Sequence, residues 1–231
     1  MKEISANAKI ETKCLHSGYS PKNGEPRVMP IVQSTTYVYD STDSVAAVFD
    51  DPTKSLIYSR FENPTTDVVE KKIAALEGGA AAMCTSSGQA ASLCAILNIC
   101  QAGDSFIASS SIYGGTINLF NVTLRRLGIE CIFVDLDAPD EEIQKHVKPN
   151  TKLFFGETIA NPALTVLDIE RIANLAHKNG VPLIVDNTFA TPCLCRPIEF
   201  GADIVVHSTS KYMDGHAVQV GGVIVDSGKF D

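Results

Sequence analysis

Short apolar runs alternate with longer amphipathic stretches along the chain from residue 60 onward. Apolar positions between residues 68 and 76 repeat at helical spacing, with Asn63-Pro64 before them and Gly78-Gly79 after them. Asn is a favoured N-cap, and Pro is a favoured first residue of a helix. Gly just past the last turn commonly ends a helix. The pattern therefore predicts a helix that begins at Asn63-Pro64 and stops at Gly78-Gly79.

Seven short apolar runs follow that helix and are typical of buried strands. They span residues 80–84, 105–108, 131–134, 152–157, 183–186, 204–207 and 222–225. Helical stretches lie near residues 88–100, 114–127, 139–147 and 168–179. This alternation predicts an α/β fold with a mostly parallel sheet and helices on both faces. Right-handed crossovers would align the C-terminal ends of the strands along one edge, where ligands usually bind.

The first part of the chain has a different composition. It contains many Ser and Thr residues, several Pro residues between Pro21 and Pro52, and little helical periodicity. Such a stretch is typical of irregular chain. We therefore expect an N-terminal arm over residues 1–59 and a large cofactor-binding domain over residues 60–231.

Composition and charge exclude several classes of partner. The chain is 45% hydrophobic and 20% charged, which is ordinary for a globular protein, and its net charge is −8. A negative net charge disfavours nucleic acid and anionic membranes as general partners. The sequence has no signal-peptide pattern and no apolar run of membrane-spanning length, so we expect a cytoplasmic protein.

The seven cysteines do not suggest a metal site. No C-x-x-C pair occurs, and most of the cysteines lie within apolar runs. Cys193-Leu194-Cys195 lacks a partner pair and a nearby histidine pattern. Reduced thiols and no metal are therefore expected.

Polar residues stand at the ends of several predicted strands. Asp186 ends one strand, Lys211 lies four residues past the end of another, and Glu157 ends a third. The run Ser86-Ser87-Gly88-Gln89 would open the helix over 88–100. Such a turn can direct free backbone N–H groups at an anion, although capping by Ser86 or Ser87 explains the same residues without a ligand.

Taken together, these residues suit pyridoxal 5′-phosphate. That cofactor needs an acid for its ring nitrogen, a lysine for covalent attachment, a helix N-terminus for its phosphate and an aromatic cover for its ring. Asp186, Lys211, the 88–100 helix and Tyr113 could supply these groups. Neither nucleotide-binding glycine motif, G-x-x-x-x-G-K-[ST] or strand-linked G-x-G-x-x-G, is present.

The stretch from Ala202 to His216 closely resembles the cofactor-attachment signature of the Cys/Met-metabolism family of pyridoxal-phosphate enzymes. Further matches follow in the family's order: Tyr58-Ser59-Arg60, Ser87-Gly88-Gln89, Tyr113-Gly114, Glu157, Asn161-Pro162 and Asp186-Asn187-Thr188. The resemblance runs from about residue 12 to the end. It implies the large domain of fold type I, the aspartate aminotransferase-like fold. It also implies a C-terminal domain beyond Asp231 that would bind the substrate carboxylate.

The resemblance also implies roles for individual residues. Lys211 would bind the cofactor covalently and then carry protons, Asp186 would pair with the ring nitrogen, and Tyr113 would stack on the ring and act with Lys211 in catalysis. The other cofactor-binding residues it implies are Ser87, Gly88, Gln89, Asn161, Ser208 and Ser210, with Tyr58 and Arg60 reaching from a neighbouring subunit. Sites shared in this way imply a homodimer or homotetramer.

The resemblance narrows the expected reaction. Gly115 stands where the γ-lyases of the family have Cys, and residues 113–120 are most similar to its sulfhydrylases. We therefore expect a transferase of methionine biosynthesis that replaces the acetate of O-acetyl-L-homoserine with sulfide or a thiol, giving homocysteine or methionine. The alternatives are a methionine γ-lyase, a cystathionine γ-synthase, or an inactive fragment that binds the cofactor or only assembles.

Overall fold

The computed structural model describes residues 4–5, 7–51 and 55–230. The chain divides into two compact units, Met1–Ala75 and Leu76–Asp231. The boundary falls inside helix α3 (Pro64–Glu77), and the predicted arm over residues 1–59 lies within the first unit.

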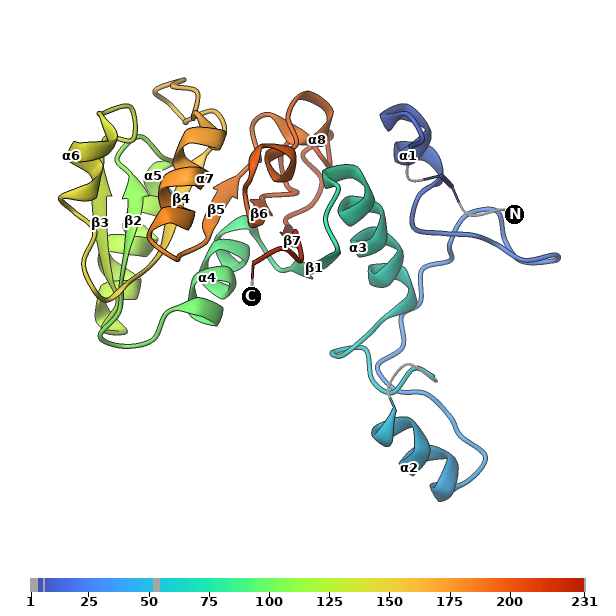
Figure 1. Ribbon diagram of the computed structural model, residues 1–231. Helices are drawn as coiled ribbons and strands as arrows, with labels where there is room; N and C mark the ends of the chain where they lie inside the picture. Colours follow the sequence, from blue (N-terminus) through green and yellow to red (C-terminus); the bar gives the residue numbers. More distant parts are fainter. Residues whose placement is uncertain (1–3, 6, 52–54, 231) are drawn as a thin grey trace. The chain divides into compact units, whose positions relative to one another are not determined.

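The N-terminal unit contains two helices that the sequence pattern did not predict (Figure 1). They are α1 (Ile10–His16) and α2 (Thr42–Asp50), so the expectation of irregular chain throughout this part was wrong. The Oγ of Ser41 caps α2 by accepting the N–H of Ser44 at 3.1 Å. α2 buries only Val48 and α1 buries no side chain, so neither helix has an apolar stripe to mark it in the sequence.

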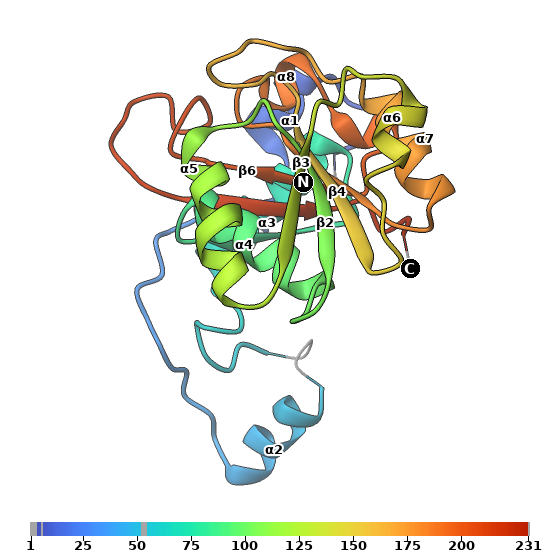
Figure 2. The ribbon, with the colours of Figure 1, turned by 90° about the vertical axis from the view of Figure 1, so that its left-hand side faces the viewer.

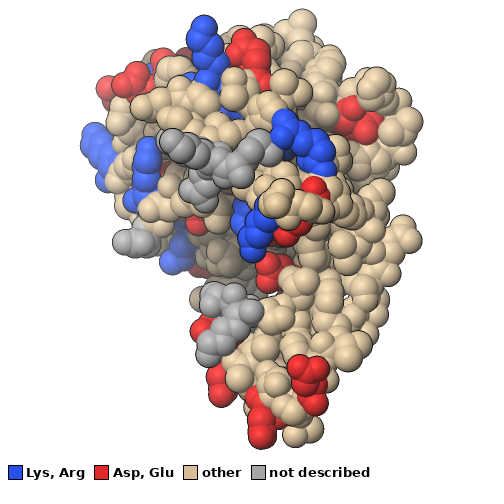
Figure 3. Space-filling view, turned by 90° about the vertical axis from the view of Figure 1, so that its right-hand side faces the viewer, with Lys and Arg blue, Asp and Glu red and all other residues tan. Residues whose placement is uncertain are grey.

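Figure 3 shows acidic side chains on the segment that carries α2. The sequence between residues 28 and 51 contains four Asp residues and no Lys or Arg: Asp40, Asp43, Asp50 and Asp51 carry its charge. This stretch is therefore locally negative.

Helix α3 begins and ends as predicted. The Oδ1 of Asn63 accepts the N–H of Thr65 at 2.9 Å, which satisfies one of the first free donors of the helix. Gly78 follows the last residue with φ +77°, a conformation that favours glycine.

One mixed sheet forms the centre of the second unit. Its strands are β1 (Ala81–Thr85), β2 (Ser105–Ser109), β3 (Glu130–Val134), β4 (Thr151–Glu157), β5 (Leu183–Asp186), β6 (Ile204–His207) and β7 (Gly222–Asp226). Their order is β1-β7-β6-β5-β4-β2-β3. The pairs among β2 to β6 are parallel, and β7 runs antiparallel to both β1 and β6. The prediction of a mostly parallel sheet is confirmed.

Helices cover both faces of this sheet, as predicted (Figure 2). α4 (Gly88–Ile99) packs on β6 and β7, whereas α7 (Ile169–Lys178) packs on β4 and β5. The core on the α4 face contains three fully buried rings. Phe120 makes edge-to-face contacts with Phe106 at 5.0 Å and with Phe155 at 4.9 Å between ring centroids.

The other helical segments differ from the prediction in detail. The stretch 114–127 is a short α5 (Gly114–Asn118) followed by a π-helix η2 (Leu119–Leu124), and α6 (Asp140–Gln144) is shorter than predicted. Two short turns of helix were not predicted, α8 (Thr191–Leu194) and the 3₁₀-helix η3 (Pro197–Phe200). Within the described residues, no helix has the length and apolar character to cross a membrane.

Candidate active site

The candidate site lies at the C-terminal ends of β4, β5 and β6, where parallel strands present their last side chains. Glu157 is the register partner of Asp186, and Asp186 is the partner of Val206. Lys211 follows β6 after a turn in which its N–H donates to the carbonyl of Ser208 at 3.3 Å. The structure shows that the strands before the acid and the lysine, β5 and β6, are neighbours in the sheet, which the sequence did not predict.

Asp186 is connected to the end of β6 through Thr188. The N–H of Thr188 donates to Oδ1 of Asp186 at 2.9 Å, and the Thr188 hydroxyl accepts the N–H of Ser208 at 2.8 Å. Burial raises the pKa of Asp186, while the Thr188 hydrogen bonds and the nearby His207 act in the opposite direction. A cation beside the Asp186 carboxyl would favour its ionised form.

Glu157 holds two of the surrounding loops. Its Oε1 accepts the N–H of Tyr113 at 2.7 Å, and its Oε2 accepts the N–H of Asn161 at 3.1 Å. Burial raises the pKa of Glu157 to about 7, and the charge of Asp186 adds to that rise. The two N–H bonds act against it. The sequence marked Glu157 as a family match but gave it no role.

The N-terminus of α4 meets the end of β6 at close range. A Cβ at Gly88 would lie 2.5 Å from the Cβ of Ser208, so only glycine permits this approach. The Ser87 Oγ caps the helix by accepting the N–H of Ala90 at 3.1 Å. The Ser87 side chain therefore acts as an N-cap, as the alternative interpretation of the sequence proposed. The N–H groups of Gly88 and Gln89 lie in the first turn of the helix, where they have no intrahelical acceptor.

Gln89 and Ser210 make contacts within the protein. The Nε2 of Gln89 donates to the hydroxyl of Thr116 at 3.0 Å, which links α4 to α5. The hydroxyl of Ser210 accepts the N–H of Gly221 at 2.9 Å and donates to its carbonyl at 3.2 Å. Both side chains therefore brace the loops around the strand ends, and their contacts to a cofactor stay a prediction.

Tyr113 stands at the start of α5, and about half of its side chain is exposed. Its carbonyl accepts the N–H groups of Thr116 and Ile117 at 2.9 and 3.0 Å. A Cβ at Gly115 would lie 2.5 Å from Cε1 of the Tyr113 ring. The absence of a side chain at position 115 therefore permits the observed position of the ring.

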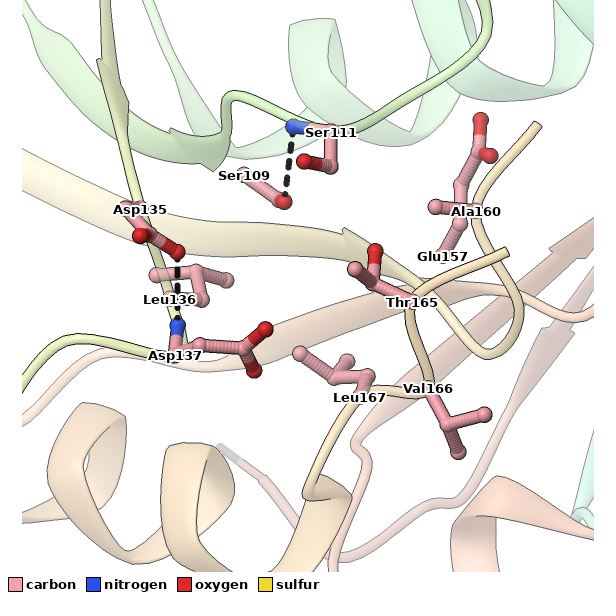
Figure 4. A pocket seen from close by; sticks show the side chains of 10 residues that line it. All are labelled: Ser109, Ser111, Asp135, Leu136, Asp137, Glu157, Ala160, Thr165, Val166 and Leu167. Carbon is pink, nitrogen blue, oxygen red and sulfur yellow. Dashed lines mark hydrogen bonds between the residues drawn. The ribbon is translucent and has the colours of Figure 1, made fainter. Parts of the chain in front are cut away.

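A small pocket opens beside Glu157 (Figure 4). Its polar lining comes from the ends of β2, β3 and β4 and the loops that follow them. The polar residues are Ser109, Ser111, Asp135, Asp137, Glu157 and Thr165. In Figure 4 the Glu157 carboxyl points away from Asp135 and Asp137. The pocket is rich in acids, so it does not attract the phosphate of a cofactor.

A buried polar network lies next to Asp186 along the chain. Nε2 of His207 is 2.5 Å from Oε1 of Glu77, and Nδ2 of Asn187 donates to the same Glu77 oxygen at 2.9 Å. The Oδ1 of Asn187 accepts the hydroxyl of Thr158 at 2.8 Å. Sequence reasoning assigned no role to Glu77, because Glu77 and His207 are 130 positions apart.

Tyr58 and Arg60 belong to the N-terminal unit. The guanidinium carbon of Arg60 lies 5.4 Å from the centroid of the Tyr58 ring and 4.7 Å from that of Phe61. These contacts are cation–π interactions. Among the described residues Arg60 makes no ion pair, so its charge remains available to an anion.

The described residues fit pyridoxal phosphate. Backbone atoms approach closely at Gly88 and Ser208, where a side chain would fill the space below the α4 N-terminus. Asp186 and Lys211 make no ion pair with any other described residue, which leaves an acid and an amine unmatched at neighbouring strand ends. The acid suits the ring nitrogen of pyridoxal phosphate, the N–H groups at the start of α4 suit its phosphate, and the amine suits its aldehyde.

The chain belongs to a family of pyridoxal-phosphate enzymes. A sequence profile of the Cys/Met metabolism PLP-dependent enzyme family matches residues 11–231. The predicted family and its cofactor, pyridoxal phosphate, are thereby confirmed.

Individual relatives are similar over nearly the whole chain. An O-acetyl-L-homoserine sulfhydrylase of Leptospira meyeri is 47% identical over 226 residues, covering 97% of this chain and 51% of the relative. A protein of the same name from Corynebacterium glutamicum is 49% identical, covering 96% and 51%. A homocysteine synthase of Schizosaccharomyces pombe is 50% identical, covering 96% and 52%.

Solved structures share the fold. An O-acetylhomoserine (thiol)-lyase of Campylobacter jejuni, with N′-pyridoxyl-lysine-5′-monophosphate in its chain, matches with a TM-score of 0.91 and 38% identity. The match covers 97% of this chain and 55% of that one. The metB protein of Corynebacterium glutamicum matches with a TM-score of 0.89 and 36% identity. The predicted fold class is confirmed, and this chain spans about half the length of the relatives it matches.

Proposed function

We propose that the full-length protein uses pyridoxal phosphate to replace the acetate of O-acetyl-L-homoserine with sulfide or a thiol. One observation carries this proposal: Asp186 ends β5 and Lys211 follows the neighbouring parallel strand β6, in a chain that is 47% and 49% identical to two O-acetyl-L-homoserine sulfhydrylases. The geometry supports the cofactor, and the relatives' names support the substrate.

The cofactor is held by residues at the strand ends and at the N-terminus of α4. Asp186 would pair with the ring nitrogen, Tyr113 would cover the ring, and Asn161 would contact the oxygen substituent of the ring. The backbone of Gly88 and Gln89 would bind the phosphate together with Ser87, Ser208 and Ser210. Bound pyridoxal phosphate supplies an electron sink for negative charge that develops on the amino-acid substrate.

Two residues of this chain act on the substrate itself. The Nζ of Lys211 removes the proton from Cα of the substrate and carries protons between its carbons. The hydroxyl of Tyr113 holds a proton near the leaving group. The overall reaction converts O-acetylhomoserine and hydrosulfide into homocysteine and acetate. The bond from Cγ to oxygen breaks and a bond from Cγ to sulfur forms.

In this proposal, Tyr58 and Arg60 bind the phosphate of the cofactor that is held by a neighbouring subunit. The contact of Arg60 with two aromatic rings supports it, because stacking pre-orients a guanidinium that makes no ion pair among the described residues. The protein is then a homodimer or homotetramer with shared sites. Arg60→Ala should weaken cofactor binding and assembly, whereas Arg126→Ala, at an exposed position, should leave both unchanged in sedimentation and titration.

We also place the protein in the cytoplasm. No disulfide bond joins the seven cysteines, all of which lie among the described residues, and reducing compartments keep cysteines in that state. Fractionation of cells that produce the full-length protein tests this placement.

An assay of the full-length protein with O-acetylhomoserine and sulfide tests the reaction. We expect homocysteine to form in the unaltered protein and in Lys178→Ala, at an exposed lysine, but not in Lys211→Ala. The absence of homocysteine above the Lys211→Ala level would refute the proposal. Release of 2-oxobutanoate from methionine without added thiol would instead indicate a γ-lyase.

A further inference from the structure

Glu157 and Asp186 form a cross-strand pair of acids. They are register partners on the parallel strands β4 and β5, so their side chains leave the same face of the sheet. Adjacent strands lie about 4.8 Å apart. An acid beside an acid at this spacing is unfavourable when both are ionised, unless a cation or a proton lies between or near them.

The Glu157 carboxyl also connects two loops. Only 7% of Glu157 is exposed, and its two oxygens accept the N–H groups of Tyr113 and Asn161 at 2.7 and 3.1 Å. These loops carry two of the residues proposed to contact the cofactor ring. A single side chain thus holds the backbone of both loops.

The charged group that acts on Glu157 is another acid, Asp186, its register partner on β5. Asp135 and Asp137, from the segment after β3, line the same pocket, but the Glu157 carboxyl points away from them. Burial raises the pKa of Asp186, and His207, on β6, offsets part of that rise. Glu157 has no ion pair among the described residues, so no protein cation compensates its charge.

We propose that Glu157 is a positioning residue: it fixes the backbone of Tyr113 and Asn161, and it holds a proton that leaves when the ring nitrogen of pyridoxal phosphate pairs with Asp186. The inference rests on the proposed function. Burial and the neighbouring Asp186 raise the pKa of Glu157 to about 7, so its carboxyl is partly protonated near neutral pH. A positive ring nitrogen beside Asp186 offsets the field that keeps the proton on Glu157.

Loss of this proton strengthens the two hydrogen bonds. An ionised carboxylate accepts N–H groups more strongly than a protonated one does. The proton passes from Glu157 to solvent, and no other bond changes. Arrival of the cofactor therefore tightens the loops that carry Tyr113 and Asn161.

Calorimetry in two buffers of different ionisation heat counts the protons released when pyridoxal phosphate binds to the full-length apoprotein. Glu157→Gln keeps the size of the side chain but cannot release a proton. We expect the unaltered protein to release about one proton more per cofactor than Glu157→Gln at pH 6, and close to none more at pH 8. Glu141→Gln, at an exposed position, should behave like the unaltered protein. Equal proton counts for the unaltered protein and Glu157→Gln at pH 6 would overturn the inference.

Hydrogen exchange in the cofactor-free protein tests the two backbone contacts separately. Glu157→Gln can present only one acceptor oxygen, so we expect faster exchange in a segment that contains Tyr113 or Asn161. Unchanged exchange in both segments would contradict the positioning role.

If Glu157→Gln does not fold, the infrared band of a protonated carboxyl in the unaltered apoprotein at pH 6 tests the inference instead. We expect this band to disappear when pyridoxal phosphate binds. Failure of the unaltered protein to bind the cofactor would refute the proposed function, while the exchange measurement would still decide the backbone role.

Discussion

The Nε2 of His207 lies 2.5 Å from Oε1 of Glu77, and neither side chain is exposed to solvent by more than 1%. The same Glu77 oxygen accepts the Nδ2 of Asn187, the residue after Asp186. The end of α3 is thereby fixed to the ends of β5 and β6. A buried polar pair of this kind stabilises a structure only while both members are present.

Glu77→Ala should lower the free energy of unfolding by about 3–5 kcal/mol, because it leaves Nε2 of His207 buried without its partner and Nδ2 of Asn187 with only the carbonyl of Cys195. Glu141→Ala, at an exposed glutamate, should change it by less than about 0.5 kcal/mol. Urea unfolding of the full-length protein measures both values. A loss below about 1 kcal/mol for Glu77→Ala would show that the pair contributes little.

Local sequence signals predicted the strands well, because each strand is a short apolar run bounded by polar or turn residues. The bounds of β5 and β6 agree with the prediction at both ends. Pairings across the sheet could not be predicted in this way. The acid–acid pair of Glu157 and Asp186 depends on register, and the contact of Glu77 with His207 joins distant segments. The family resemblance named residues but not these contacts.

For the helices, too, local sequence patterns predicted some elements and missed others. α7 agrees with the helix predicted near residues 168–179, and it buries five apolar residues: Ile169, Ile172, Ala173, Leu175 and Ala176. The change from α5 to the π-helix η2 leaves the stretch apolar, so periodicity could not reveal it. α1 and α2 bury almost nothing, so neither helix has an apolar stripe that the sequence could show.

Gly115→Ala should displace the ring of Tyr113, because the new Cβ would lie 2.5 Å from Cε1. The ring is half exposed and can move, so the free energy of unfolding should change by less than about 1 kcal/mol. The effect should instead appear as weaker binding of pyridoxal phosphate, measured by absorbance titration. Gly114→Ala is the matched control, since its Cβ would meet no atom within 4 Å. Equal cofactor affinity in the two variants would show that the residue at position 115 does not determine the position of the Tyr113 ring.

Thr188→Val should loosen the connection between Asp186 and the end of β6. The valine keeps the shape of the side chain but removes the hydroxyl that accepts the N–H of Ser208. We expect a loss of about 1–2 kcal/mol in the free energy of unfolding and weaker cofactor binding. Thr188→Ser retains the hydroxyl and should keep most of both. Urea unfolding and cofactor titration measure the two effects, and a Thr188→Ser variant as impaired as Thr188→Val would exclude the hydroxyl as the cause.

Glu157→Gln should remove a pH dependence from the stability of the cofactor-free protein. The pKa of Glu157 is about 7 in the folded chain and has the ordinary value of 4.5 when unfolded. Between these values the folded state binds more protons, so the free energy of unfolding contributed by this group falls as pH rises from 4.5 to 7. The full fall is about 3 kcal/mol. Relative to the unaltered protein, Glu157→Gln should therefore gain stability by about that amount between pH 4.5 and pH 8 in urea unfolding, while Glu141→Gln should show a constant difference. If the stability difference between Glu157→Gln and the unaltered protein is constant across this range, Glu157 ionises in the folded chain as easily as in water. Some group other than a proton on Glu157 would then have to offset the repulsion between Glu157 and Asp186.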